Sequence, residues 1–145
     1  MVYLLRELDG KKQILLQKRG KGTFGSEMWE ASAAGHVEQG ESLTMCAQRE
    51  ALEEIGIKFN PEDIEFLTII HVLPVEPPPL DNPYYNGHFF VTRWDGEPYV
   101  CECDKCMCLE WFDLDEMPKE MFADRSTAIH NYKNKIAYSE KGWRR

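Results

Sequence analysis

Residues 35–57 read GHVEQGESLTMCAQREALEEIGI, and this stretch predicts the best-defined helix of the chain, from Ser42 to Ile55. Ser42 is a preferred N-cap residue, and Gly56 suits the C-cap because glycine adopts the left-handed conformation freely. Apolar residues recur on one side of the helix and predict the stripe that packs on a core: Ala51, Leu52 and Ile55. The stretch therefore predicts an amphipathic helix with defined ends.

The other side of this helix is acidic. Glu50, Glu53 and Glu54 stand at i, i+3 and i+4, so their side chains fall within one arc about 100° wide. Like charges at these spacings weaken a helix by about 0.2–0.5 kcal/mol per pair, and a helix selected only for stability would tend to avoid them. Three convergent carboxylates become favourable when a hard divalent cation such as Mg²⁺ lies among them. We therefore predict a metal-binding face, with a solvated acidic surface as the alternative.

The loop before the helix has residues that can form a tight turn and hold it against the helix. Gly35 and Gly40 allow a tight turn, and Glu41 precedes the N-cap. Arg49 follows about two turns along the helix, where its guanidinium can reach back to Glu41. A Glu41–Arg49 ion pair is expected to tie the loop to the helix.

These residues resemble the Nudix box, G-x5-E-x7-R-E-U-x-E-E-x-G-U, in which U is an aliphatic residue. The fixed positions of the box are all filled in this chain: Gly35, Glu41, Arg49, Glu50, Glu53, Glu54 and Gly56. Ala51 and Ile57 stand at the aliphatic positions, and Ala33-Ala34 stands where the family often has Pro-Gly. The resemblance covers most of the chain and is greatest to the MutT-like branch of the family.

The resemblance implies a fold, a cofactor and a set of ligands. The implied fold is the Nudix α/β/α sandwich around a mixed sheet, formed as a single domain over residues 1–145 with a loop-helix-loop at the box. The implied cofactor is Mg²⁺, with Mn²⁺ as a possible substitute. Four carboxylates and one backbone carbonyl are the implied ligands: Glu50, Glu53, Glu54, Glu102 and the carbonyl of Ala34. Glu50 is also the implied general base with Arg49 beside it, whereas Gly35, Glu41 and Gly56 have structural roles.

The resemblance also implies two substrate-binding residues, Arg19 and Asp124, of which Arg19 matches an arginine that contacts substrate in the MutT-like branch. Apart from the resemblance, the rings of Phe24, Trp29 and Phe89 could stack on a base, with core packing as the favoured interpretation for each. Asp124 matches the first of two aspartates that read the base in family members acting on oxidised purine triphosphates, but Arg125 replaces the second. Because an arginine only donates hydrogen bonds, we predict that selectivity for oxidised purines is not preserved. A capping role for Asp124 in the last helix is the alternative.

The rest of the chain predicts strands around the acidic helix and a second helix near the end. A hairpin with a turn at Asp9-Gly10, three later strands and a closing helix are expected: Val2–Leu5, Ile14–Leu16, Ile64–Val72, Tyr84–Trp94, Val100–Phe112 and Asp124–Ile136. The segments Arg19–Glu27 and Leu73–Pro83 carry glycines or prolines without apolar periodicity, which predicts loops. Strands around one strong internal helix predict an α/β fold with a mixed sheet.

Four of the five cysteines lie between residues 101 and 108. Thiolates favour zinc, but the spacing C-x-C-x2-C-x-C is not the usual paired knuckle and Glu102 sits inside it. On a strand, Cys101 and Cys103 would share one face and Glu102 would take the other. Packed free thiols are the favoured interpretation and a zinc site is the alternative.

The composition narrows the classes of partner. The chain has 145 residues, and 17 Lys plus Arg against 25 Asp plus Glu give a net charge of −8. Such a surface repels nucleic-acid polymers, and no apolar run reaches the roughly 18 residues of a membrane helix. The odd number of cysteines and the absence of an apparent signal peptide predict reduced thiols and a cytoplasmic location. A small phosphorylated substrate can approach so acidic a protein only when cations intervene.

The expected function is Mg²⁺-dependent hydrolysis of a nucleoside triphosphate or a related nucleoside diphosphate derivative, which yields a monophosphate plus pyrophosphate or another phosphorylated product. A hydrolase of ADP-ribose or another nucleoside-diphosphate-sugar is an alternative, kept open by Pro74 beyond the box. A non-catalytic nucleotide sensor is a further alternative, disfavoured by the intact glutamates. An isopentenyl diphosphate isomerase, suggested by residues Ser32–His36, is disfavoured by the complete hydrolase box.

Overall fold

The computed structural model describes residues 1–73, 85–94 and 96–143. Within these residues the chain forms strands β1 to β7, helices α1 and α2 and a short 3-10 turn. Their bounds are β1 Val2–Leu8, β2 Lys11–Arg19, β3 Trp29–Glu30, α1 Leu43–Ile55, the turn Pro61–Asp63, β4 Glu65–Val72, β5 Tyr85–Arg93, β6 Cys106–Asp113, α2 Ala123–Asn134 and β7 Tyr138–Lys141. Among them, no helix combines the length and the apolar character needed to cross a bilayer.

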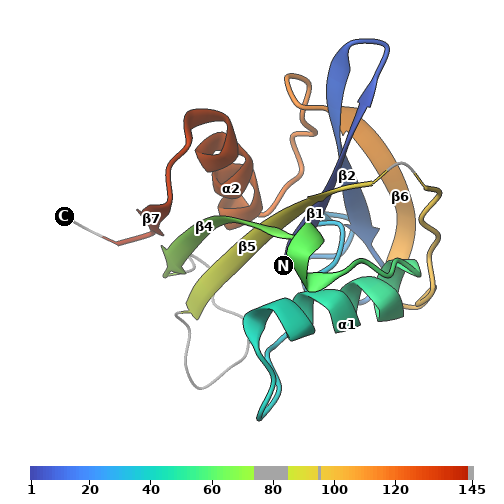
Figure 1. Cartoon of the computed structure of the whole chain (residues 1–145), viewed down its shortest axis with the longest axis horizontal. Helices are drawn as coiled ribbons and strands as arrows, with labels where there is room; N and C mark the ends of the chain where they lie inside the picture. Colours follow the sequence, from blue (N-terminus) through green and yellow to red (C-terminus); the bar gives the residue numbers. More distant parts are fainter. Residues whose placement is uncertain (74–84, 95, 144–145) are drawn as a thin grey trace.

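The strands form one mixed sheet in the order β3-β2-β1-β5-β4-β7, with β6 paired to β2. The pairs β1–β5 and β4–β7 are parallel, whereas the other strand pairs are antiparallel. Alternate residues of each strand face opposite sides, so Tyr3 packs in the core cluster beneath α2 and Leu4 in the cluster beneath α1. Figure 1 shows the two helices on either side of the sheet. The predicted α/β/α sandwich around a mixed sheet is confirmed.

The ends of α1 follow from local chemistry. The side chain of Ser42 accepts a hydrogen bond from the N–H of Met45, and Gly56 adopts the left-handed conformation with a φ of 69°. Gly56 also has no room for a Cβ atom, which would lie 2.4 Å from the ring of Tyr99. Ala51 and Ile55 are buried as predicted, but the prediction for Leu52 is wrong, because its side chain is half-exposed. Cys46 and Ala47 occupy the buried side instead.

The remaining sequence predictions hold in part. The hairpin turns at Asp9-Gly10 with φ angles of 51° and 75°, as this dipeptide favours. The strand predicted over 100–112 begins only at Cys106, because the N–H groups of Lys105 and Cys106 both donate to the carbonyl of Glu102 and form a turn. The short strands β3 and β7 were not predicted, and Ile136 lies beyond the end of α2. Most of the predicted loop Leu73–Pro83, including Pro74, lies outside the described residues.

Candidate active site

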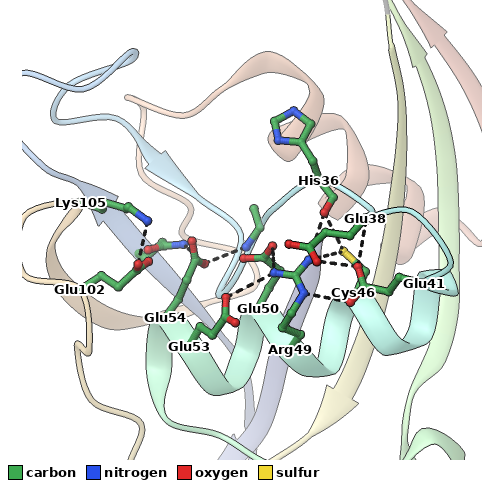
Figure 2. Close-up of polar contacts among 12 residues, drawn as sticks. His36, Glu38, Glu41, Cys46, Arg49, Glu50, Glu53, Glu54, Glu102 and Lys105 are labelled. Carbon is green, nitrogen blue, oxygen red and sulfur yellow. Dashed lines mark hydrogen bonds and ion pairs between the residues drawn. The ribbon is translucent and has the colours of Figure 1, made fainter.

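The acidic face of α1 meets the loop at Ala34–Gly35. Figure 2 shows Glu50, Glu53 and Glu54 along this side of the helix with the Arg49 guanidinium among the carboxylates. A Cβ atom on Gly35 would lie 1.8 Å from Oε1 of Glu50, so only glycine lets the carboxylate lie against this backbone. The loop and the helix therefore approach each other at the position where the box has its first glycine.

Arg49 holds this region together. Its Nε and Nη2 donate to the two carboxylate oxygens of Glu41 at 2.9 and 3.0 Å, and Nη2 also donates to the carbonyl of His36 at 3.1 Å. The predicted Glu41–Arg49 ion pair is thus present and bidentate. These hydrogen bonds lower the pKa of Glu41 to about 2. On its other side, Nη1 donates to Glu50 at 2.7 Å and to Glu53 at 3.3 Å, so one guanidinium orients three carboxylates.

Glu54 lies at the end of the acidic face where the loop and β2 cover its carboxylate. Its Oε2 accepts hydrogen bonds from the N–H of Ala34 and from Nε2 of Gln17, both at 2.9 Å. Burial raises the pKa of Glu54 to about 7, although these two donors act against the shift. Ala34 thus contacts the acidic face through its N–H, and its carbonyl as a metal ligand stays a prediction.

Glu102 lies in a turn fastened to two elements. The N–H groups of Tyr99 and Cys101 donate to the carbonyls of Ile55 and Glu54 in the last turn of α1. On the far side, the N–H of Gly20 donates to the carbonyl of Lys105. These bonds bring Glu102 to the Glu54 end of the acidic face, where its carboxylate pairs with Lys105 Nζ at 2.7 Å (Figure 2).

The acidic side chains supply the type of ligand atom that a hard cation binds, since Mg²⁺ prefers carboxylate oxygens. As they stand, their oxygens are directed to Arg49, Lys105, Gln17 and Ala34. Accordingly, in the described parts of the chain no group of three His, Cys, Asp or Glu side chains is close enough to hold a metal ion. The side chain of Glu53 is 54% exposed, so its rotamer is free to change. A cation bound by Glu102 together with the carboxylates of α1 would also displace Lys105 from Glu102.

Among the cysteines between residues 101 and 108, Cys106 is buried, but the packed-thiol interpretation is wrong for Cys101 and Cys103, which are exposed.

The three predicted substrate-binding residues converge on a second, buried polar network. Arg19 donates through Nε to the carbonyl of Phe24 and through Nη1 to Glu30. Glu30, only 3% exposed, also pairs with Arg125, and Arg125 in turn pairs with Asp124. The network therefore joins β2 and β3 to the start of α2.

The rings around this network differ in exposure. Phe24 is 53% exposed and stacks on Phe122, over which the Arg125 guanidinium also lies. Trp29 and Phe89 are buried in the core, which confirms the favoured interpretation for these two rings. Phe24 is thus the ring of these three that remains open to a ligand.

Asp124 does not cap α2. The N-cap is Phe122, which makes no side-chain capping bond, and Asp124 is buried in the first turn. Its Oδ2 accepts from the hydroxyl of Tyr85 at 2.9 Å and pairs with Arg125. The capping alternative is therefore wrong, because the carboxylate turns into the buried network.

Asp124→Ala is expected to lower the free energy of unfolding by about 3 kcal/mol, because it removes a partner from the buried Arg125. A capping residue would cost only about 1 kcal/mol. The double variant Asp124→Ala/Arg125→Leu should recover part of the loss, since Glu30 keeps Arg19 as its partner. Urea denaturation of the three proteins measures this. A loss near 1 kcal/mol without recovery in the double variant would contradict the pairing.

Metal-free protein should show a pH-dependent stability that depends on Glu54. Its pKa rises from 4.5 to about 7, so the folded state binds this proton more tightly than the unfolded chain. This contribution is complete below the unfolded pKa and is lost as the pH rises through 7, about 3 kcal/mol in all. Urea denaturation in EDTA should show Glu54→Gln close to the wild type near pH 4.5 and more stable at about pH 8. A gap that does not change with pH would contradict the burial of Glu54.

Several residues of the two networks carry no sequence signal. Gln17, Glu30, Tyr85 and Lys105 contact the predicted residues but belong to no motif. Two of the histidines make described contacts outside the acidic side chains: the backbone carbonyl of His36 accepts from Arg49, and Nδ1 of His71 is hydrogen-bonded to Asn86 between β4 and β5.

Comparison with known proteins shows which family the chain is similar to. A family model described as NUDIX domain matches residues 2–132. The oxidized purine nucleoside triphosphate hydrolase of Danio rerio is 31% identical over 123 residues, which are 79% of this chain and 67% of that protein. The isopentenyl-diphosphate Delta-isomerase of Serratia proteamaculans (strain 568) is 26% identical over 113 residues, 77% of this chain and 60% of the isomerase.

The fold agrees with these matches. The crystal structure of a MutT NUDIX hydrolase from Burkholderia pseudomallei is similar with a TM-score of 0.70 at 24% identity, over 89% of this chain and 93% of that one. The match to the family model spans the acidic helix, strands β1 to β6 and most of α2. The chain therefore belongs to the NUDIX domain family, which confirms the predicted membership of the Nudix hydrolases.

Proposed function

We propose that the chain is a Mg²⁺-dependent pyrophosphohydrolase that cleaves a phosphoric anhydride bond of a nucleoside triphosphate or a related nucleoside diphosphate derivative. The observation that carries the proposal is the close approach of Glu50 and Glu54 to the loop at Ala34–Gly35. It places carboxylates from a helix beside backbone from a loop, on a face already oriented by Arg49. Nudix hydrolases generally use divalent metal ions, and these are the residues that would hold one.

The proposed ligands are Glu50, Glu53, Glu54, Glu102 and the carbonyl of Ala34. When bound, Mg²⁺ would neutralise the phosphates and activate water. Glu50 is the proposed general base, since a carboxylate beside the reacting water can accept its proton. Arg49 orients Glu50 and fixes the loop through Glu41. These roles need no cationic protein surface, in keeping with the net charge of −8.

Arg19, Phe24 and Asp124 are the proposed substrate contacts. Nε of Arg19 donates to the backbone carbonyl of Phe24 at 2.7 Å, which holds a cation close to the residue whose ring is exposed. Asp124 is already paired with Arg125, so its carboxylate is less available as an acceptor than an unpaired aspartate. We therefore expect normal purine triphosphates to be hydrolysed at rates comparable to those of oxidised ones.

A nucleotide panel with and without Mg²⁺ tests the proposal. It should contain normal and oxidised nucleoside triphosphates, ADP-ribose, a nucleoside-diphosphate-sugar and isopentenyl diphosphate, with product identification by chromatography. We expect Mg²⁺-dependent release of a nucleoside monophosphate from the triphosphates. Turnover confined to ADP-ribose or to the sugar nucleotide would replace the substrate class, and isomerisation without hydrolysis would overturn the reaction. Binding without any turnover would favour the sensor.

A further inference from the structure

The side chain of Gln17 makes a hydrogen bond to Glu54 that the packing of the sheet does not explain. It lies on β2, is 4% exposed, and stands two residues after Leu15, which packs in the core cluster beneath α1. Side chains two apart on a strand share a face, so packing alone favours another apolar residue at this position. The buried amide costs free energy unless it is hydrogen-bonded. Its Nε2 donates to Oε2 of Glu54 at 2.9 Å, across 37 residues of sequence.

A second donor reaches the same oxygen. The N–H of Ala34 donates to Oε2 of Glu54 at 2.9 Å, from the loop that precedes α1. The last torsion of a glutamate side chain is broad and weakly restrained by itself. Two donors on one oxygen, from β2 and from the loop, fix that torsion, and Oε1 takes no part in either bond.

We propose that Gln17 is a positioning residue for Glu54: its amide holds one carboxylate oxygen so that the other is presented toward the acidic face of α1 for a divalent cation. This inference rests on the proposed function, which makes Glu54 a metal ligand. Groups that orient a ligand from behind typically contribute about 10- to 100-fold to metal affinity. Gln17 does not contact the metal or the substrate in this scheme and acts through Glu54.

The test measures Mn²⁺ binding, by the loss of the free-ion signal in electron paramagnetic resonance, without any substrate. Gln17→Met keeps the length of the side chain and removes the donor, and Gln17→Leu is a second apolar replacement. Both should bind Mn²⁺ about 10- to 100-fold more weakly than the wild type. Gln13→Leu is the matched control, since Gln13 lies on the same face of β2 but bonds Arg6 and Asp113. It should leave Mn²⁺ affinity unchanged.

Turnover gives an independent readout that a merely structural role would not move. If Gln17 positions a metal ligand, saturating Mg²⁺ should restore most of kcat in Gln17→Met, with the loss confined to the Mg²⁺ concentration required. Equal Mn²⁺ affinity in the wild type and in both folded variants would overturn this inference alone. A kcat loss that Mg²⁺ does not relieve would also overturn it. A wild type that binds no Mn²⁺ would overturn the proposed function together with the inference.

Discussion

Glu53→Gln should lower Mg²⁺-dependent turnover by about 100-fold or more while the protein stays folded. Glutamine at this position removes one negative charge from the set proposed to hold the cation. Stability should hold or rise slightly, because Glu53 is 54% exposed and its one described ion pair, to Arg49, is 3.3 Å long. Removing a like charge three residues from Glu50 and beside Glu54 also relieves repulsion along the helix.

Steady-state hydrolysis measures the expected loss of turnover, and urea denaturation of the same preparation measures the expected stability. Glu7→Gln is the control, since Glu7 is an exposed glutamate on β1 away from the acidic face of α1. It removes the same charge from the protein and should leave turnover unchanged. Near-normal turnover of Glu53→Gln at limiting Mg²⁺ would remove Glu53 from the ligand set.

Gly35→Ala should cause a loss of turnover similar to that of removing Glu50, although no carboxylate is deleted. The added Cβ would lie 1.8 Å from Oε1 of Glu50. The clash is with the far end of a flexible side chain, so the carboxylate swings away from the loop while the backbone stays in place. We expect turnover to fall about 100-fold and stability to change by less than about 1 kcal/mol.

A double-mutant cycle isolates the cause. If Gly35→Ala acts by displacing Glu50, then Gly35→Ala/Glu50→Gln should be no slower than Glu50→Gln alone. Additive losses would show that the loop acts through something other than Glu50. Kinetics of the four proteins under one set of conditions provides the answer.

The helix and its acidic face could be predicted from the sequence because their causes are local. Ser42 and Gly56 mark the ends of α1 within one stretch, and the spacing of the glutamates alone places them on one face. The Glu41–Arg49 ion pair could also be predicted, since it joins residues only eight positions apart. The hairpin turn at Asp9-Gly10 is of the same kind.

What the sequence could not show depends on partners distant along the chain. Glu30 and Arg125 pair across 95 residues, and neither belongs to a motif that predicts the other. The two-residue strand β3 forms because β2 supplies its hydrogen-bonding partner, not because Trp29-Glu30 has a pattern. The turn at Glu102 exists because α1 and Gly20 hold it on both sides, which the alternation of cysteines concealed. Ion pairs and hydrogen bonds between distant residues therefore determine these features, which the local sequence pattern did not indicate or indicated wrongly.

If the acidic face of α1 holds the catalytic cation, iron-mediated cleavage should locate that cation directly. Fe²⁺ with ascorbate and peroxide generates radicals that cut the backbone near the bound metal, and mass spectrometry identifies the cuts. We expect cleavage at Ala34–Gly35 and around Glu50–Glu54, suppressed by excess Mg²⁺ and by Glu53→Gln. Cleavage that spares both of these segments, or that Mg²⁺ does not suppress, would contradict this placement of the cation.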